Sequence, residues 1–280
     1  MILVTGATGH IPKSAIAALA RSATPVRVLA RDPAKAPAGT TAVAGDLTDP
    51  RSLTTAFAGI DTLILVTPAS PELVAMHGNA LAAAQAAGVR KIVRVSAWGA
   101  ATDSPAALGR WHGELDARFR ASGLAYVSLQ PHGFLQNTFG YAGSIKAANA
   151  IYAPLGTGRV CYLDSRDIGE VAAAAARATT WDGRTLELTG PAAFSYAELA
   201  AAVSQLVGRP ISYVDVPPAA ARDAMLAAQL PAWLVDDLLV LSRLYAADLA
   251  STPTTTVADV LGRPATSLAS FLSEHRDGFA

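Results

Sequence analysis

The ten amino-terminal residues constrain the fold of this chain more than any other segment. The apolar run Ile2–Val4 leads into a turn with glycines at positions 6 and 9, and an amphipathic stretch begins at Ile11. A short apolar strand, a glycine turn and a helix form the first unit of a doubly wound parallel sheet. Because the first turn of a helix has unpaired backbone N–H groups, this segment predicts a phosphate-binding site.

Each residue of this turn has an expected role. Gly6 permits the tight turn, and Gly9 lets the backbone approach a pyrophosphate. Pro12 stands where such turns usually have a third glycine. Its missing N–H is tolerated at the first helical position, but its ring adds bulk, so we expect it to weaken dinucleotide binding without abolishing it. The expected cofactor-binding residues here are Gly6, Thr8, Gly9, His10 and Ile11.

The first half of the chain alternates short β-rich runs with helical stretches. Runs without strict alternation indicate strands that are buried on both faces, and successive β-α units imply right-handed crossovers in a parallel sheet. The expected strands are Ile2–Val4, Val26–Leu29, Thr41–Ala44, Thr62–Val66, Lys91–Val95 and Tyr126–Leu129. The expected helices are Ile11–Arg21, Pro50–Phe57, Pro71–Ala87 and Ala107–Ala121.

The pattern changes after Pro131. The rest of the chain is mostly helical, with short strands expected at Thr185–Leu188 and Ile211–Val214 and a loop at Tyr152–Gly158. We predict an α/β fold: a Rossmann-like, doubly wound parallel sheet over residues 1–130, rejoined by residues 165–180. Residues 131–280 are expected to form a smaller, mostly helical region that caps the substrate.

Composition and charge exclude several classes of protein. The 280 residues include 22 basic and 22 acidic ones, and no Lys/Arg-rich run occurs, so we expect no nucleic-acid partner. The single cysteine excludes an intramolecular disulfide, and the five histidines have no metal-binding spacing, so we expect no metal. Neither a secretory signal nor an apolar run of about 18 residues is present, so we expect a cytoplasmic protein without a membrane partner. The sequence does not predict the oligomeric state.

The end of the second expected strand should meet the adenosine ribose of a dinucleotide. Arg31 offers a planar guanidinium to a 2′-phosphate, whereas Asp32 would accept from a 2′-hydroxyl. We expect NADPH because Arg31 comes first after the strand, and NADH is the alternative. Further cofactor contacts are expected after the third and fourth strands, at Asp46, Leu47, Thr67 and Pro68.

Candidate catalytic and substrate residues follow the fifth and sixth strands. Histidine exchanges protons near neutral pH, which makes it a candidate acid or base. His112 is either such a group or a structural histidine on a helix, and His132 is expected to lie near a substrate. Aromatic side chains suit a flat aromatic substrate. The expected catalytic residues are His132, His112 and Ser96, and the expected substrate contacts are Trp98, Phe134 and Asn137.

Several segments together resemble the NmrA-like group of atypical short-chain dehydrogenase/reductases, which includes type 2 NAD(P)H:quinone oxidoreductases. The resemblance covers nearly the whole chain. It departs from the family at Pro12 and at Gln130, which replaces the arginine of the family's usual Leu-Arg-Pro. The segments that carry the resemblance are Thr5–Gly9, Val26–Pro33, Gly45–Leu47, Ala86–Val93, Trp111–Glu114, Ser122–Tyr126, Phe134–Asn137, Asp164–Ile168, Tyr196–Leu199 and Leu261–Pro264.

The resemblance implies an NAD(P)H-dependent oxidoreductase for a quinone or similar flat aromatic substrate. None of the seven tyrosines has a lysine four positions later, so the Tyr–Lys proton relay of ordinary short-chain dehydrogenases is not expected. Two alternatives stay open. One is a tailoring enzyme that oxygenates or couples a dihydroquinone in aromatic polyketide biosynthesis. The other is a non-enzymatic redox sensor that binds the dinucleotide and regulates a partner protein.

Overall fold

The computed structural model describes residues 1–280 and divides the chain into two compact units. The first unit comprises residues 1–131, 165–188 and 256–263. The second comprises residues 132–164, 189–255 and 264–280. The boundary that the sequence suggested, at residue 130, lies next to Pro131, the last residue of strand β6.

A seven-stranded parallel sheet forms the centre of the first unit, in the order β3-β2-β1-β4-β5-β6-β9. The expected doubly wound sheet is therefore confirmed. The strand order reverses between β1 and β4, where such sheets bind ligands beyond the carboxyl ends of the strands. The strands are β1 (Ile2–Val4), β2 (Val26–Ala30), β3 (Thr41–Ala44), β4 (Thr62–Leu65), β5 (Lys91–Val95), β6 (Ala125–Pro131) and β9 (Thr185–Leu188).

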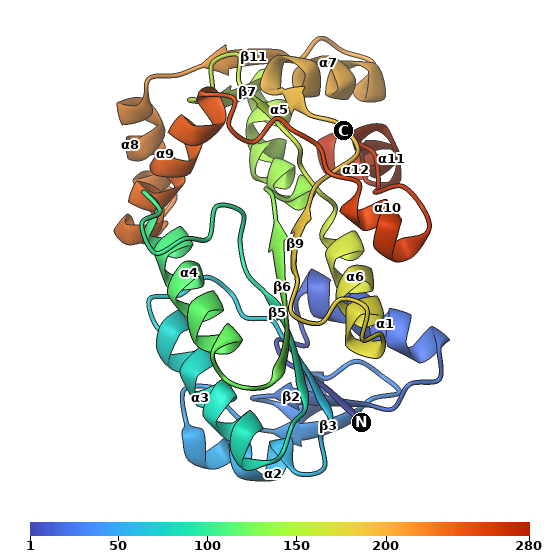
Figure 1. Ribbon diagram of the computed structural model, residues 1–280. Coiled ribbons are helices and arrows are strands. Elements are labelled where there is room, and N and C mark those ends of the chain that lie inside the picture. Colours follow the sequence, from blue (N-terminus) through green and yellow to red (C-terminus); the bar gives the residue numbers. More distant parts are fainter. The chain divides into compact units, whose positions relative to one another are not determined.

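Helices cover both faces of this sheet. Figure 1 shows α1 and α6 on one face and α3 and α4 on the other. The short α10 packs against α6, and Arg263 beyond it donates to Asp167 and Glu170 of α6, at 2.7 Å each. The helices of the first unit are α1 (His10–Arg21), η1 (Pro33–Lys35), η2 (Pro50–Ser52), α2 (Leu53–Phe57), α3 (Leu73–Ala86), α4 (Ala107–Arg120), α6 (Ser165–Arg177) and α10 (Thr256–Leu261).

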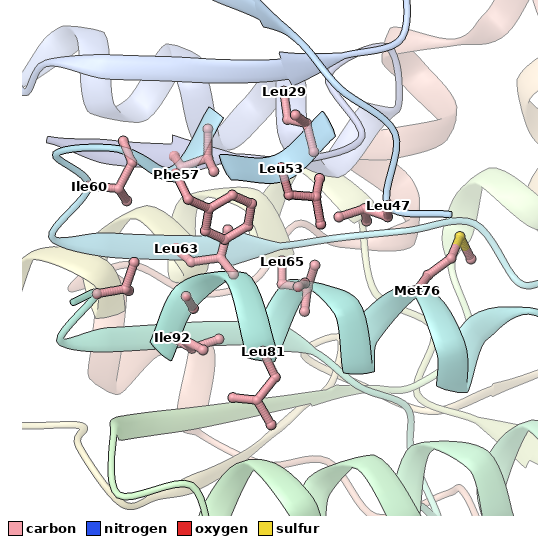
Figure 2. Close-up of a cluster of buried hydrophobic side chains, with 14 of the residues drawn as sticks. Leu29, Leu47, Leu53, Phe57, Ile60, Leu63, Leu65, Met76, Leu81 and Ile92 are labelled. Atoms are coloured by element: carbon pink, nitrogen blue, oxygen red, sulfur yellow. The ribbon is translucent and has the colours of Figure 1, made fainter. Parts of the chain in front are cut away.

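A cluster of aliphatic and aromatic side chains fills the space between the sheet and α2 and α3 (Figure 2). Leu63 and Leu65 of β4, Ile92 of β5 and Phe57 of α2 are fully buried in it. Each such side chain stabilises the fold by about 1.5–3 kcal/mol relative to an exposed one. This packing holds the parallel strands in register, so that their carboxyl ends meet at one edge.

The second unit is made of shorter elements. Its strands form two small sheets, β7 with β11 in parallel and β8 with β10 antiparallel. The expectation of a loop at Tyr152–Gly158 is wrong for Tyr152 and Ala153, which belong to β7, because a strand of four residues leaves little periodicity to detect. The elements are η3 (Leu135–Tyr141), α5 (Ala142–Ala148), β7 (Ala150–Ala153), β8 (Arg159–Val160), β10 (Phe194–Ser195), α7 (Tyr196–Val207), β11 (Ser212–Asp215), α8 (Pro218–Ala227), α9 (Ala232–Ala246), α11 (Leu268–Glu274) and α12 (Arg276–Phe279).

Helices α1 and α6 approach each other closely at Gly169. A Cβ atom at this glycine would overlap the backbone carbonyl oxygen of Ile11 and would lie 2.8 Å from the backbone nitrogen of Ala15. Backbone atoms of a packed helix yield less easily than a flexible side chain. The absent side chain of Gly169 thus sets the position of α1, and α1 begins at the glycine turn.

We expect Gly169→Ala to lower the free energy of unfolding by about 1–3 kcal/mol, because the added methyl group overpacks the contact between the two helices. Thermal unfolding followed by circular dichroism would measure the change. Gly143→Ala in α5 is the matched control, because a Cβ atom there meets nothing within 4 Å. Alanine is the better helix former, so the control should be unchanged or slightly more stable. Equal effects of the two substitutions would contradict the overpacking explanation.

Candidate functional site

The glycine turn between β1 and α1 has the geometry of a phosphate cradle. Gly6 has a φ angle of +71°, and a Cβ atom there would lie 2.8 Å from the carbonyl oxygen of Val66. Only glycine fits this conformation without strain. Thr8, Gly9 and His10 are exposed, and the N–H of Gly9 donates to Gly6 at 2.9 Å to close the turn. The turn therefore leaves its backbone open to an incoming anion.

Helix α1 supplies two amides to this turn. It begins at His10. Pro12 is therefore the third helical residue, whereas the sequence suggested that it is the first. The N–H of Lys13 makes the first bond of the helix, to the carbonyl of Gly9 at 3.2 Å. The N–H groups of His10 and Ile11 have no acceptor within the helix, and Pro12 has no N–H. The cradle thus fits the pyrophosphate of a dinucleotide, with one donor fewer than a turn with three glycines.

A side-chain clamp joins the end of β1 to the end of β4. The Thr5 hydroxyl donates to the carbonyl of Val66 at 2.7 Å and accepts from the N–H of Val66 at 2.9 Å. Both residues are buried. The half-buried Thr67 and the exposed Pro68 follow this clamp directly, beside the glycine turn. The structure therefore brings two of the expected cofactor residues next to the cradle.

The residues after β2 and β3 leave one cation accessible. Arg31 is exposed and makes no hydrogen bond or ion pair. Asp32 caps η1 by accepting from the N–H of Ala34 at 3.1 Å. Asp46 accepts the backbone N–H and hydroxyl of Thr48, and these bonds hold its pKa below the usual value. Leu47 is buried in the apolar cluster. Arg31 is thus the side chain at this edge that suits a phosphate.

A buried polar cluster lies between the sheet and α3 and α4, toward the carboxyl ends of β5 and β6. Arg94 is fully buried at its centre and donates to Asp116 at 2.5 Å. Its Nε atom donates to His77 Nδ1 at 2.9 Å, and its Nη2 atom lies 2.6 Å from His112 Nδ1. We call this group the Arg94–Asp116 cluster; its members are Arg94, Asp116, His77, His112, Tyr126, Ser96, Ser128 and Gln130.

Asp116 is the shared acceptor of this cluster. Besides Arg94, its carboxylate accepts the hydroxyl of Tyr126 at 2.5 Å, of Ser128 at 3.0 Å and of Ser96 at 3.1 Å. Burial alone would raise the pKa of Asp116, but the positive charge of Arg94 and these hydrogen bonds lower it. The carboxylate is therefore charged and fully hydrogen-bonded, as a buried charge requires.

The two histidines of the cluster are neutral. Burial, together with the charge of Arg94, lowers the pKa of His112 from 6.5 to about 3 and lowers that of His77 well below its usual value. Titration near neutral pH was the basis on which we expected His112 to transfer a proton, and this basis does not hold in the structure. A catalytic role for His112 stays a prediction, restricted to a neutral imidazole that donates a hydrogen bond.

The expected roles of Ser96 and Gln130 also change in this setting. The hydrogen of the Ser96 hydroxyl is directed to Asp116, so Ser96 can offer only lone pairs to another group. Gln130, at the family's arginine position, donates to the same carboxylate at 3.0 Å. A cation is nevertheless present, because Arg94 on the neighbouring strand reaches Asp116. Arg94 and Gln130 therefore both serve the carboxylate of Asp116, and Arg94 supplies the positive charge.

The remaining expected site residues lie in both units. Trp98, in the first unit, is half-buried, and its backbone N–H donates to the carbonyl of Pro131 at 3.0 Å. His132 is buried in the second unit and follows β6 directly. Phe134 forms a bridge with Leu163, and Asn137 is exposed on η3. Their expected roles toward a substrate stay predictions.

No group of three or more His, Cys, Asp or Glu side chains is arranged to hold a metal ion. None of the helices combines the length and the apolar character that a membrane span requires.

Comparisons with known proteins agree with this geometry. A family model described as NAD(P)H-binding matches residues 6–178. The NAD(P)H azoreductase of Xenophilus azovorans is 39% identical over 283 residues, which cover 100% of this chain and 99% of that protein. The (4-alkanoyl-5-oxo-2,5-dihydrofuran-3-yl)methyl phosphate reductase of Streptomyces griseus is 33% identical, with coverage of 100% and 99%. The NADPH-dependent quinone oxidoreductase of Escherichia coli, solved with NADPH, is 27% identical with a TM-score of 0.91, covering 98% of this chain and 99% of that chain.

Exchanging Arg94 and Gln130 would test whether either position can supply the cation that Asp116 needs. Arg94→Gln leaves the buried Asp116 charge uncompensated, so the free energy of unfolding should fall by about 3–5 kcal/mol in urea titrations. The double variant Arg94→Gln/Gln130→Arg has the same composition as the wild type and returns a cation to Asp116. We expect it to recover at least half of the loss. A double variant no more stable than Arg94→Gln would contradict the idea that either position can serve this carboxylate.

Because both histidines are neutral in the folded protein, we expect acid to destabilise it at pH values well above those at which carboxylates titrate. Below pH 6.5 the unfolded chain binds protons at His77 and His112 that the folded chain excludes. The free energy of unfolding therefore decreases as the pH is lowered. The slope should reach up to about 1.4 kcal/mol per pH unit for each histidine. Urea titrations between about pH 7.5 and about pH 5 would measure it. His112→Gln should make the slope shallower, and a flat profile in the wild type would refute the prediction.

Proposed function

This chain belongs to the NAD(P)H-binding family, and from that premise we propose that it transfers a hydride from NADPH to an electron-poor conjugated acceptor, a quinone or an azo compound. It is an NAD(P)H-dependent oxidoreductase, as its relatives are. The observation that carries the choice of acceptor is the Arg94–Asp116 cluster, whose two histidines are neutral imidazoles near the strand ends and so are not charged acids.

The roles of the chain's own residues follow from the cradle. Gly6 and the amides of His10 and Ile11 would hold the pyrophosphate, and Arg31 would hold the 2′-phosphate. Thr67 and Pro68 would contact the cofactor beyond β4. When bound, the reduced nicotinamide supplies the hydride, and the protein supplies position and exclusion of water.

Conjugated acceptors suit a site without a Tyr–Lys relay. Hydride addition to a quinone gives an aromatic hydroxyphenolate, which takes its proton from water without a protein acid. Hydride addition to an azo group and protonation give a hydrazine, and a second equivalent of the reductant would cleave it to two amines. The azoreductase and the quinone oxidoreductase among the relatives support acceptors of this kind.

The test is oxidation of NADPH by the purified protein with a panel of quinones and azo dyes. We expect turnover with members of one or both classes and one hydroquinone formed for each NADPH consumed. Binding of NADPH without turnover on any acceptor would overturn the proposal and would favour the redox sensor. Oxygen uptake with hydroquinones would favour the tailoring enzyme. Both of these alternatives remain predictions from the sequence.

Arg31 should decide the preference for NADPH over NADH. We expect Arg31→Gln to weaken NADPH about tenfold to a hundredfold, because a charge-assisted bond to the 2′-phosphate is lost, while the affinity for NADH stays the same. Calorimetric titration with both cofactors measures the ratio. Arg90→Gln, at the amino end of β5 and in an exposed ion pair with Asp61, is the matched control. An unchanged ratio in Arg31→Gln would contradict the assignment.

A further inference from the structure

A line of hydrogen bonds leads from the buried charge of Asp116 to a hydroxyl beside the glycine turn. Arg94 donates from Nη1 to Asp116 and from Nε to His77 Nδ1, at 2.5 and 2.9 Å. The Nε2 atom of His77 lies 2.8 Å from the hydroxyl oxygen of Thr67. Arg94 and His77 are fully buried, whereas Thr67 is half-buried. The line therefore starts in the core and ends at the surface of the first unit.

The chemistry of these groups fixes the direction of every hydrogen in the line. A guanidinium group only donates, so His77 Nδ1 must accept and carries no proton. A neutral imidazole then has its proton on Nε2, and this atom donates to Thr67 Oγ1. The Thr67 oxygen is thus an acceptor toward His77. Its own hydrogen is therefore left for another acceptor.

Thr67 lies where its hydroxyl hydrogen can be donated to a cofactor bound at the glycine turn. It follows Val66, whose carbonyl oxygen would lie 2.8 Å from a Cβ atom on Gly6. It therefore stands beside the turn whose amides suit a pyrophosphate. Phosphate oxygens accept hydrogen bonds and do not donate them. A hydroxyl hydrogen that is not used by His77 is complementary to such an oxygen, while Ser96 has committed its hydrogen to Asp116.

We propose that Thr67 donates its hydroxyl hydrogen to a pyrophosphate oxygen of the bound dinucleotide, and that His77 and Arg94 are positioning residues that fix the direction of this donation. The inference rests on the proposed function, because it needs a bound NAD(P)H. It extends the role of the buried cluster from stability to cofactor binding, and it assigns a positioning task to the fully buried His77.

The first test is the affinity for NADPH, measured by calorimetry. Thr67→Val keeps the shape of the side chain and removes the hydroxyl, so we expect about tenfold to a hundredfold weaker binding. Thr67→Ser retains the hydroxyl and should restore affinity to within about threefold of the wild type. Thr41→Val, at the exposed start of β3, is the matched control and should bind as the wild type does.

A second readout addresses His77 directly and needs no cofactor. Two-bond proton–nitrogen NMR spectra distinguish the two tautomers of a histidine ring. The histidine whose ring signals move in Thr67→Val should carry its proton on Nε2. A proton on Nδ1, or on both nitrogens, would overturn the positioning role of His77 and Arg94.

The outcomes separate this inference from the proposed function. If the wild type binds NADPH and Thr67→Val binds it equally well, the inference fails while the proposed function stands. If Thr67→Ser is as weak as Thr67→Val, the hydroxyl is not the cause of the loss and the inference fails. If the wild type binds no NADPH, both fail.

Discussion

The ion pair between Arg94 and Asp116 is the interaction on which the candidate site depends. Both groups are almost completely removed from water, so each needs the other and each needs further hydrogen bonds. The carboxylate meets this need with donors from β6 and from Ser96 just after β5, and the guanidinium meets it with two imidazoles from α3 and α4. One charge pair therefore fixes four elements of the first unit relative to one another, beneath the edge where the cofactor is expected.

The main sheet was largely predictable from the sequence. Strands β1, β3, β5 and β9 begin and end where the sequence predicts them, because each is a short β-rich run bounded by turn residues. In the second unit only β11 was expected, one residue early at Ile211–Val214, and its partner β7 was missed. Strands β8 and β10 escaped detection, since they have only two residues each and gain their stability from pairing with distant segments. Local sequence contains little information about such pairing.

The candidate site was predictable only in part. The glycine turn and Arg31 have local signals, and the NAD(P)H-binding family to which the chain belongs agrees with them. The Arg94–Asp116 cluster had a faint signal, an arginine inside the apolar run Lys91–Val95, whose meaning depends on residues up to 32 positions away. The neutral state of His112 follows from burial and from Arg94, and neither is visible in sequence. The convergence of Arg94 and Gln130 on Asp116 likewise depends on the pairing of β5 with β6.

The central claim is that a hydroxyl oriented from the core completes a pyrophosphate site at the glycine turn. A crystal structure of the wild-type protein with NADPH would test it most directly. The account predicts a pyrophosphate oxygen about 2.7 Å from Thr67 Oγ1, with the same diphosphate on the amides of His10 and Ile11. A diphosphate held by the turn but out of hydrogen-bond reach of Thr67, or a cofactor bound away from the turn, would contradict it.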